Sequence, residues 1–181
     1  RAGARFAVYV GLVGQEWAGG HADPALGVLL VSIAPGPTPR MEMEQEIPHE
    51  LAHSVIYQVT GPGYVSLPNW LNEGLATYYE QFPSPEYSVA LAMAAGSNTL
   101  LSFSDLCTAF PFDEEQALLA YAQSASLVGY VRDQYGSASI ANLLNAYADG
   151  ALCESGVERG LGPSLDRLSA DWERDVFHSN R

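Results

Sequence analysis

Residues 49–53 read His-Glu-Leu-Ala-His, and residues 70–80 read Trp-Leu-Asn-Glu-Gly-Leu-Ala-Thr-Tyr-Tyr-Glu. His49 and His53 are four residues apart, so on a helix they share one face and lie about 6 Å apart along the axis. Two imidazoles placed in this way can bind one Zn²⁺ at about 2.0–2.1 Å. Glu50 is rotated by roughly 100° from His49 and points beside the metal, where it can act as a general base on a bound water.

The first stretch has the features of a helix from about Gln45 to Thr60. Pro48 suits a first-turn position, where its missing N–H costs nothing. Residues 61–63 read Gly-Pro-Gly, a sequence that stops a helix. Apolar side chains that recur at helical spacing can face a core while the histidines face a cleft: Leu51, Ala52, Val55, Ile56 and Val59.

The second stretch predicts a helix over residues 70–80. Asn69 is a plausible N-cap, and Phe82-Pro83 ends the pattern. Small residues beside Glu73 would let this helix approach another backbone closely, as a carboxylate that shares a metal with His49 and His53 requires. These small residues are Gly74, Ala76 and Thr77.

The two stretches together resemble the gluzincin zinc peptidases, and most closely the peptidase MA-like family of bacterial proteins. They are also similar to the zinc aminopeptidases and to thermolysin-like enzymes, and a weaker similarity extends over most of the chain. The resemblance implies a zincin-like fold, a peptide or protein substrate, one Zn²⁺ bound by His49, His53 and Glu73, and Glu50 as the catalytic base. It implies that Asn72 orients a ligand, a role that metal-binding histidines usually need filled.

Three protein ligands leave one coordination position open for water, which is typical of a catalytic zinc site. The leading hypothesis is therefore a zinc metallopeptidase. One alternative is a zinc-binding or peptide-binding module that uses the gluzincin scaffold without turnover. A minor alternative is a zinc hydrolase that acts on another bond, such as a lipid ester.

A peptidase also needs a hydrogen-bond donor for the oxyanion that forms during attack. Residues 113–135 predict a long helix with an acidic first turn, and Tyr121 lies on it among small residues. We expect Tyr121 to be this donor, with Tyr130 as the second choice. An ordinary half-buried helix tyrosine is an equally good interpretation of either.

Several features narrow the specificity or fall outside the site. The aminopeptidases carry a Gly-x-Met-Glu-Asn segment before the histidine helix, whereas residues 40–44 read Arg-Met-Glu-Met-Glu. We interpret Met41–Glu46 as an acidic, solvated lead-in to the active-site helix, so aminopeptidase specificity is not supported. We expect His21, in a loop, and His178, near the C-terminus, to be exposed or capping residues.

The order of elements predicts an α+β fold in one domain, residues 1–181, and the abrupt start suggests a fragment of a longer protein. Its N-terminal part, residues 1–66, would hold strands over 5–12 and 27–33 and the active-site helix. The resemblance to zincins implies that one strand borders the cleft and pairs with substrate, and residues 28–33 are the candidate, with a purely structural role in the core as the alternative. The helical part, residues 67–181, would add helices near 84–95, 113–135, 138–148, 151–160 and 164–177, with Ser84, Asp113 and Ser164 as caps.

The net charge of −13 comes from 21 acidic and 8 basic residues, and all of the basic ones are arginine. This balance argues against nucleic acid and anionic membranes as partners, because both attract basic patches. No membrane-spanning stretch is present in the sequence, and the oligomeric state is not indicated. Cys107 and Cys153 favour one disulfide over two buried thiols, which suggests an extracytoplasmic or secreted bacterial protein.

Overall fold

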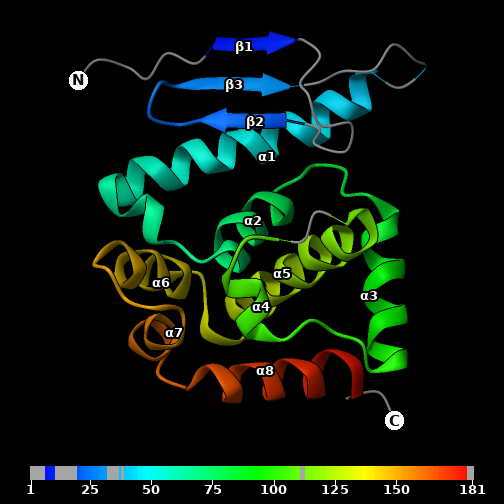
Figure 1. Cartoon of the computed structure of the whole chain (residues 1–181), viewed down its shortest axis with the longest axis vertical. Coiled ribbons are helices and arrows are strands. Elements are labelled where there is room, and N and C mark those ends of the chain that lie inside the picture. Colours follow the sequence, from blue (N-terminus) through cyan, green and yellow to red (C-terminus); the bar gives the residue numbers. More distant parts are fainter. Residues whose placement is uncertain (1–6, 11–19, 32–36, 38, 111–112, 179–181) are drawn as a thin grey trace.

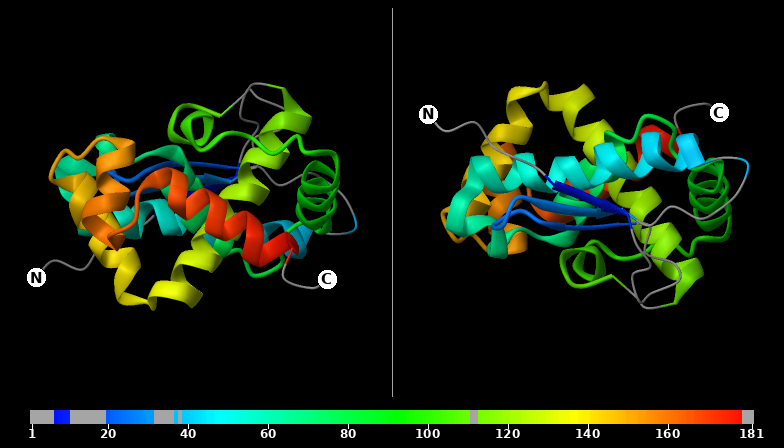
Figure 2. Two further views of the ribbon diagram at one scale, coloured as in Figure 1. Left: turned by 90° about the horizontal axis from the view of Figure 1, so that it is seen from below. Right: turned by 90° about the horizontal axis from the view of Figure 1, so that it is seen from above.

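The computed structural model describes residues 7–10, 20–31, 37, 39–110 and 113–178. A small sheet lies against one side of helix α1 (Pro39–Thr60), and the other helices lie on the opposite side of α1 (Figure 1). The views from above and below show the same layering (Figure 2). The protein is therefore α+β and mainly helical, as the sequence predicted.

The sheet has three strands, β1 (Ala7–Val10), β2 (Gly20–Asp23) and β3 (Val28–Val31), in the order β1-β3-β2. β3 pairs in parallel with β1 and antiparallel with β2. The two predicted strands are confirmed within the described residues, whereas β2 was missed. Leu29 and Val31 are buried, and Val28 and Leu30 are half-buried, so β3 has covered faces.

The central position of β3 corrects one expectation from the sequence. Residues 28–31 are paired with a strand on each side, so their backbone N–H and C=O groups are already used. A substrate strand therefore cannot add to β3, and the prediction that residues 28–33 border the cleft is wrong for the described part of that segment. Addition of a strand would have to take place at β1 or β2.

Helix α1 begins six residues earlier than predicted. Pro39 occupies the first helical position, the role that the sequence analysis gave to Pro48, and Pro48 lies inside the helix. Arg40 and Glu44 form an ion pair of 2.7 Å one turn apart, which supports the first turns. The acidic lead-in is therefore part of the helix, and α1 ends at Thr60 before the predicted Gly-Pro-Gly stop.

The helical half follows the predicted order closely. The caps predicted at Ser84, Asp113 and Ser164 are confirmed, since each side chain accepts a hydrogen bond from a backbone N–H in the next turn. Asn69 is the first residue of its helix, and Pro68 holds the cap position instead. The elements are the 3₁₀ helix η1 (Gly61–Ser66), α2 (Asn69–Tyr78), α3 (Pro85–Ser97), α4 (Phe103–Cys107), α5 (Glu114–Tyr135), α6 (Ala138–Ala148), α7 (Cys153–Leu161), α8 (Leu165–Glu173) and a π-helical turn, η2 (Arg174–His178).

The hydrophobic core lies on the side of α1 away from the sheet, among α2, α5, α6, α7 and α8. Its largest side chains are essentially inaccessible to solvent, and the polar atoms of two of them are satisfied. The indole N–H of Trp172 donates to Ser126 Oγ, and the hydroxyl of Tyr147 donates to the Cys153 carbonyl. The fully buried members include Trp70, Leu71, Leu127, Tyr147, Leu168 and Trp172.

Helix α2 packs most extensively against α5. At the contact, a Cβ added to Gly74 would lie 2.7 Å from the carbonyl oxygen of Ser124 and 2.8 Å from its carbonyl carbon. Only glycine therefore allows this approach of two backbones. The sequence predicted a close approach at this glycine, and the structure identifies α5 as the helix that is approached.

Cys107, at the end of α4, and Cys153, at the start of α7, form the disulfide that the sequence favoured. Their Cα atoms are 6.0 Å apart, within the usual range for a disulfide. The bond joins segments that are 46 residues apart in the sequence. In the described part of the chain, no helix combines the length and apolar character needed to cross a membrane.

We expect Gly74→Ala to destabilise the protein by about 1–3 kcal/mol, because the added methyl group would separate α2 from α5 or strain both. Gly96→Ala in α3 is the matched control, since a Cβ at that glycine meets no atom within 4 Å. This control should stabilise by about 0.5–1 kcal/mol through helix propensity. Urea unfolding followed by circular dichroism measures both, and equal stabilities of the two variants would contradict the packing argument.

Candidate metal centre

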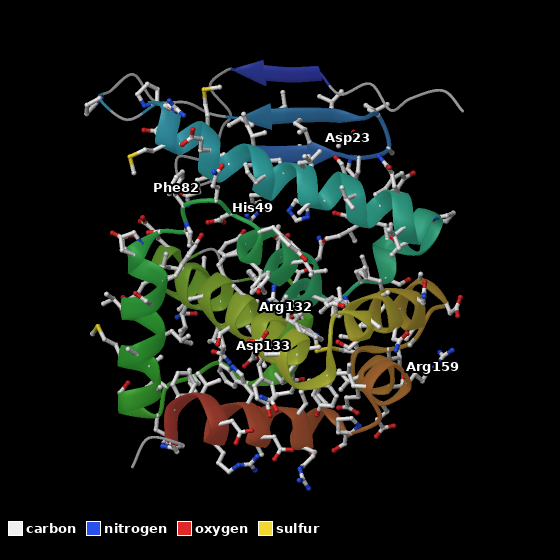
Figure 3. The ribbon with its side chains drawn as sticks, turned by 180° about the vertical axis from the view of Figure 1, so that it is seen from behind. Asp23, His49, Phe82, Arg132, Asp133 and Arg159 are labelled. Carbon is white, nitrogen blue, oxygen red and sulfur yellow. A yellow bond between two sulfur atoms is a disulfide. The ribbon has the colours of Figure 1, made fainter. Side chains whose placement is uncertain are left out.

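His49 lies on the face of α1 that is turned toward α2 and away from the sheet (Figure 3), and the ring centroid of His53 is 5.2 Å from that of His49. Glu73 reaches them from α2. Its Oε2 is 3.5 Å from Nε2 of His49 and 3.5 Å from Nε2 of His53. One ligand-type atom from each of the three residues lies within 4.8 Å of the other two. The structure thus brings together the three residues that the sequence proposed as ligands.

Each histidine is held through the ring nitrogen that faces away from Glu73. Nδ1 of His49 lies 2.9 Å from Oε1 of Glu80, and Nδ1 of His53 lies 3.1 Å from Oδ1 of Asn72. Because these oxygens accept hydrogen bonds, they favour the tautomer with the proton on Nδ1. In its neutral form each ring then has the Nε2 lone pair free for a metal ion, and both Nε2 atoms lie 3.5 Å from Oε2 of Glu73.

The two partner residues are themselves held in place. Gln45 donates from Nε2 to Oε2 of Glu80 at 3.2 Å, and Asn72 donates from Nδ2 to the Tyr64 hydroxyl at 3.2 Å. The sequence analysis named Asn72 and gave no role to Glu80. One signal could have identified Glu80: in the helix predicted over residues 70–80 it follows Glu73 by seven residues on the same face, although α2 ends at Tyr78 and Glu80 lies just beyond it.

Glu50 is buried beside the histidines, with 4% of its surface exposed. Burial raises the pKa of its carboxyl to about 7, against the opposing charges of His49 and His53. Its Oε2 is inaccessible and has no hydrogen-bond partner. A buried carboxylate oxygen without a partner needs a donor to offset its desolvation. Two of the candidate ligands, His49 and His53, lie on the same helix as Glu50.

The charged residues of the cluster shift one another's pKa values. Burial lowers the pKa of His49, but contacts with Glu73 and Glu80 outweigh it and raise the value to about 10. Burial raises the pKa of Glu73, but contacts with His49 and His53 outweigh it and lower the value to about 2. Glu73 is therefore held as a carboxylate, the form in which it can bind a cation.

Tyr121, from α5, completes one side of the cluster. Its ring centroid is 6.2 Å from that of His49, and its other neighbour is Phe110 at 5.2 Å. Burial, followed by the charges of Glu73 and Glu50, raises the pKa of Tyr121 well above its ordinary value. The hydroxyl therefore stays protonated at neutral pH and can donate a hydrogen bond.

Tyr130, the second choice for the oxyanion donor, lies elsewhere. Its hydroxyl donates to Oδ2 of Asp175 at 2.9 Å, on the side of α5 that faces η2. Tyr130 is nine residues from Tyr121, about two and a half helical turns, so the two tyrosines lie on opposite faces of α5. The structure thus contradicts Tyr130 as a site residue.

The remaining histidines are not part of the cluster. His21, expected in a loop, is an exposed residue of β2, and His178 ends η2. Arg132 and Asp133, a neighbouring ion pair on α5, also lie away from His49 (Figure 3). Among the residues that the structure describes, the one metal-type cluster is therefore His49, His53 and Glu73.

These residues fit a divalent metal ion on the observations of this structure. Two imidazole nitrogens and one carboxylate oxygen form a donor set that suits Zn²⁺. Both imidazoles have an acceptor at Nδ1, as metal-binding histidines almost always do. The unpartnered oxygen of Glu50 adds a base beside the donor set.

A small sheet, a helical half and a two-histidine, one-carboxylate cluster on two helices define an α+β protein with a candidate catalytic metal centre. Comparison with protein families then assigns it: the Peptidase MA superfamily model matches residues 8–178, so the chain belongs to that superfamily. This match confirms the gluzincin-like resemblance drawn from the sequence. The comparisons with curated proteins and with solved structures found no match.

We expect Glu80→Gln to lower zinc affinity about 10–100-fold, because it removes the negative charge that orients His49. Glu158→Gln, an exposed position on α7, is the control and should bind zinc like the unmodified protein. Competition with a chromogenic chelator measures both affinities. Equal affinities for the two variants would show that Glu80 does not support the ligand.

Proposed function

We propose that this protein is a zinc-dependent metallopeptidase of the gluzincin type, with a zincin-like catalytic arrangement in one domain. The observation that carries the proposal is the convergence of His49, His53 and Glu73 to within 4.8 Å. The buried, unpartnered carboxylate oxygen of Glu50 beside them supports it. Membership in a superfamily of peptidases supports a peptide or protein as the substrate.

Zinc, when bound by these three residues, would supply a Lewis acid for the substrate carbonyl and lower the pKa of a water. Glu50 would take a proton from the attacking water and pass it to the leaving amine. Its low exposure keeps bulk water away from this proton transfer.

Tyr121 would donate its hydroxyl proton in a hydrogen bond to the oxyanion as it forms. Its ring lies beside that of His49, on the helix opposite α1. A donor aimed at developing charge in a buried site contributes about 10²–10³-fold to the rate. Asn72 and Glu80 would not touch the substrate, and would act by orienting His53 and His49.

The disulfide supports a compartment that is oxidising. Cytosolic proteins keep their thiols reduced, whereas secreted and extracytoplasmic proteins retain such bonds. We therefore infer an extracytoplasmic or secreted location. Thiol-blocking mass spectrometry of the protein from its native cells would test this, and two free thiols at Cys107 and Cys153 would contradict it.

For the chemistry, we expect Glu50→Gln to retain zinc and lose about 10²–10⁴-fold in peptide cleavage, because it removes the base without changing the ligands. His53→Ala should lose both zinc and activity. Metal content by mass spectrometry, together with cleavage of a peptide library, separates the two effects. Undiminished cleavage by Glu50→Gln would refute the mechanism.

The same library also tests the non-catalytic alternative. If the zinc-loaded unmodified protein cleaves no peptide at several pH values, the centre binds metal without turnover. A library of random sequences is needed because side-chain preference is not fixed by the metal centre.

A further inference from the structure

A groove of 870 Å³ lies between α3 and the N-terminal half of α5. Helices α3 and α5 contact each other near the N-terminal end of α5 (Figure 1). The groove is separate from the three-residue cluster but shares Tyr121 with it. Tyr121 therefore places this part of the groove next to the cluster.

A second tyrosine links the groove to the cluster from the opposite wall. Tyr87, on α3, lines the groove. Burial, followed by the charge of Glu80, the partner of His49, raises the pKa of Tyr87. Tyr87 and Tyr121 thus line the groove from opposite helices.

Part of the groove wall is apolar. Val89 and Met93 line the groove from α3, although they are 57% and 68% exposed, and Leu118 lines it from α5. Exposed apolar side chains that line one groove are available to cover the hydrocarbon part of a ligand.

The groove also carries carboxylates, three of which are Glu86 on α3 and Glu114 and Glu115 on α5. Glu114, Leu118 and Tyr121 follow one another at four and three residues, so they share one face of α5. Glu114 is about 10 Å from Tyr121 along the helix axis. Along this face of α5, from Tyr121 toward the N-terminus of the helix, the side chains are therefore first aromatic, then aliphatic, then anionic.

Within the described ranges, no basic side chain is paired with Glu86, Glu114 or Glu115. Arg40, Arg167 and Arg174 are paired with acidic residues on their own segments. The chain has no lysine and a net charge of −13, which strengthens the negative field at this groove. A cationic ligand would meet complementary charge there.

We propose that the groove between α3 and α5 is a substrate subsite that selects a basic residue, arginine or lysine, close to the scissile peptide bond. This inference rests on the proposed peptidase function of the neighbouring cluster. The aliphatic stem packs against Val89, Met93 and Leu118, and the cationic end lies among Glu86, Glu114 and Glu115. Long basic side chains bury their stems on apolar surface in this way while the charge stays hydrated.

Other occupants match the groove less well. An acidic or phosphorylated segment would be repelled by the carboxylates, and so would a second copy of this acidic chain. A purely apolar side chain would leave the carboxylates without a counter-charge. The basic residue alone uses both the aliphatic and the anionic parts of the wall.

The direct test is a binding measurement on zinc-loaded Glu50→Gln protein, which holds a peptide without cleaving it. The probes are two alanine-rich nonapeptides that differ at the central residue, arginine in one and citrulline, its uncharged isostere, in the other. We expect the arginine peptide to bind about tenfold more tightly at low salt, because several exposed carboxylates each add a modest attraction. The difference should shrink as salt is added.

The variants locate the effect. Glu86→Gln with Glu114→Gln, added to Glu50→Gln, should remove most of the preference for arginine and leave citrulline binding unchanged. Glu154→Gln is the matched control, because Glu154 also lies in the first turn of a helix, α7, outside the groove. Equal binding of the two peptides, or loss of preference with Glu154→Gln alone, would overturn the proposal.

Cleavage of a peptide library by the unmodified protein separates this inference from the function on which it rests. Cleavage beside basic residues supports both. Cleavage with no basic preference overturns the subsite and leaves the peptidase assignment intact. If no peptide is cleaved but the arginine preference in binding persists and depends on Glu86 and Glu114, the peptidase assignment fails and the cation-selecting groove stands.

Discussion

The close contact between α2 and α5 is the constraint on which the candidate centre depends. Glu73 can lie 3.5 Å from both histidine rings only because α2 is held between α1 and α5. Gly74, the next residue, allows the backbone of α5 to approach, and the inaccessible Trp70 and Leu71 anchor the first turn of α2 in the core. Packing of apolar residues thus determines where a charged ligand stands.

Electrostatics then refines what packing has positioned. Glu80 and Asn72 fix the outward nitrogens of the two histidines, while Glu73 stays ionised between the inward ones. Glu50 is on the same helix but lacks a partner for one oxygen, so burial shifts its pKa in the opposite direction from that of Glu73. Two carboxylates a few ångströms from the same histidines are therefore suited to different tasks.

The two histidines were predictable because their geometry is local, whereas Glu73 was assigned through the resemblance of residues 70–80 to the gluzincin peptidases. Spacings of four residues on α1 and a short run on α2 fix which side chains share a face, whatever the rest of the chain does. Contacts between distant segments were not predictable in this way. The partnership of Glu80 with His49 and the central place of β3 both depend on how elements pack. The side of α5 on which Tyr130 lies, by contrast, follows from its spacing of nine residues from Tyr121. The early start of α1 was missed because Pro48 reads as a first-turn residue, although Pro39 holds that position.

A metal ion at the candidate centre would cross-link two segments of the chain, as the disulfide does. A metal ion held by His53 and Glu73 would close a loop through η1, just as the Cys107–Cys153 bond closes one through α5 and α6. The two loops do not overlap in sequence, so each restricts a different stretch of the unfolded chain. The chain would then be cross-linked twice, once in each half of its sequence. Removal of metal and reduction of the disulfide would loosen separate parts of the molecule.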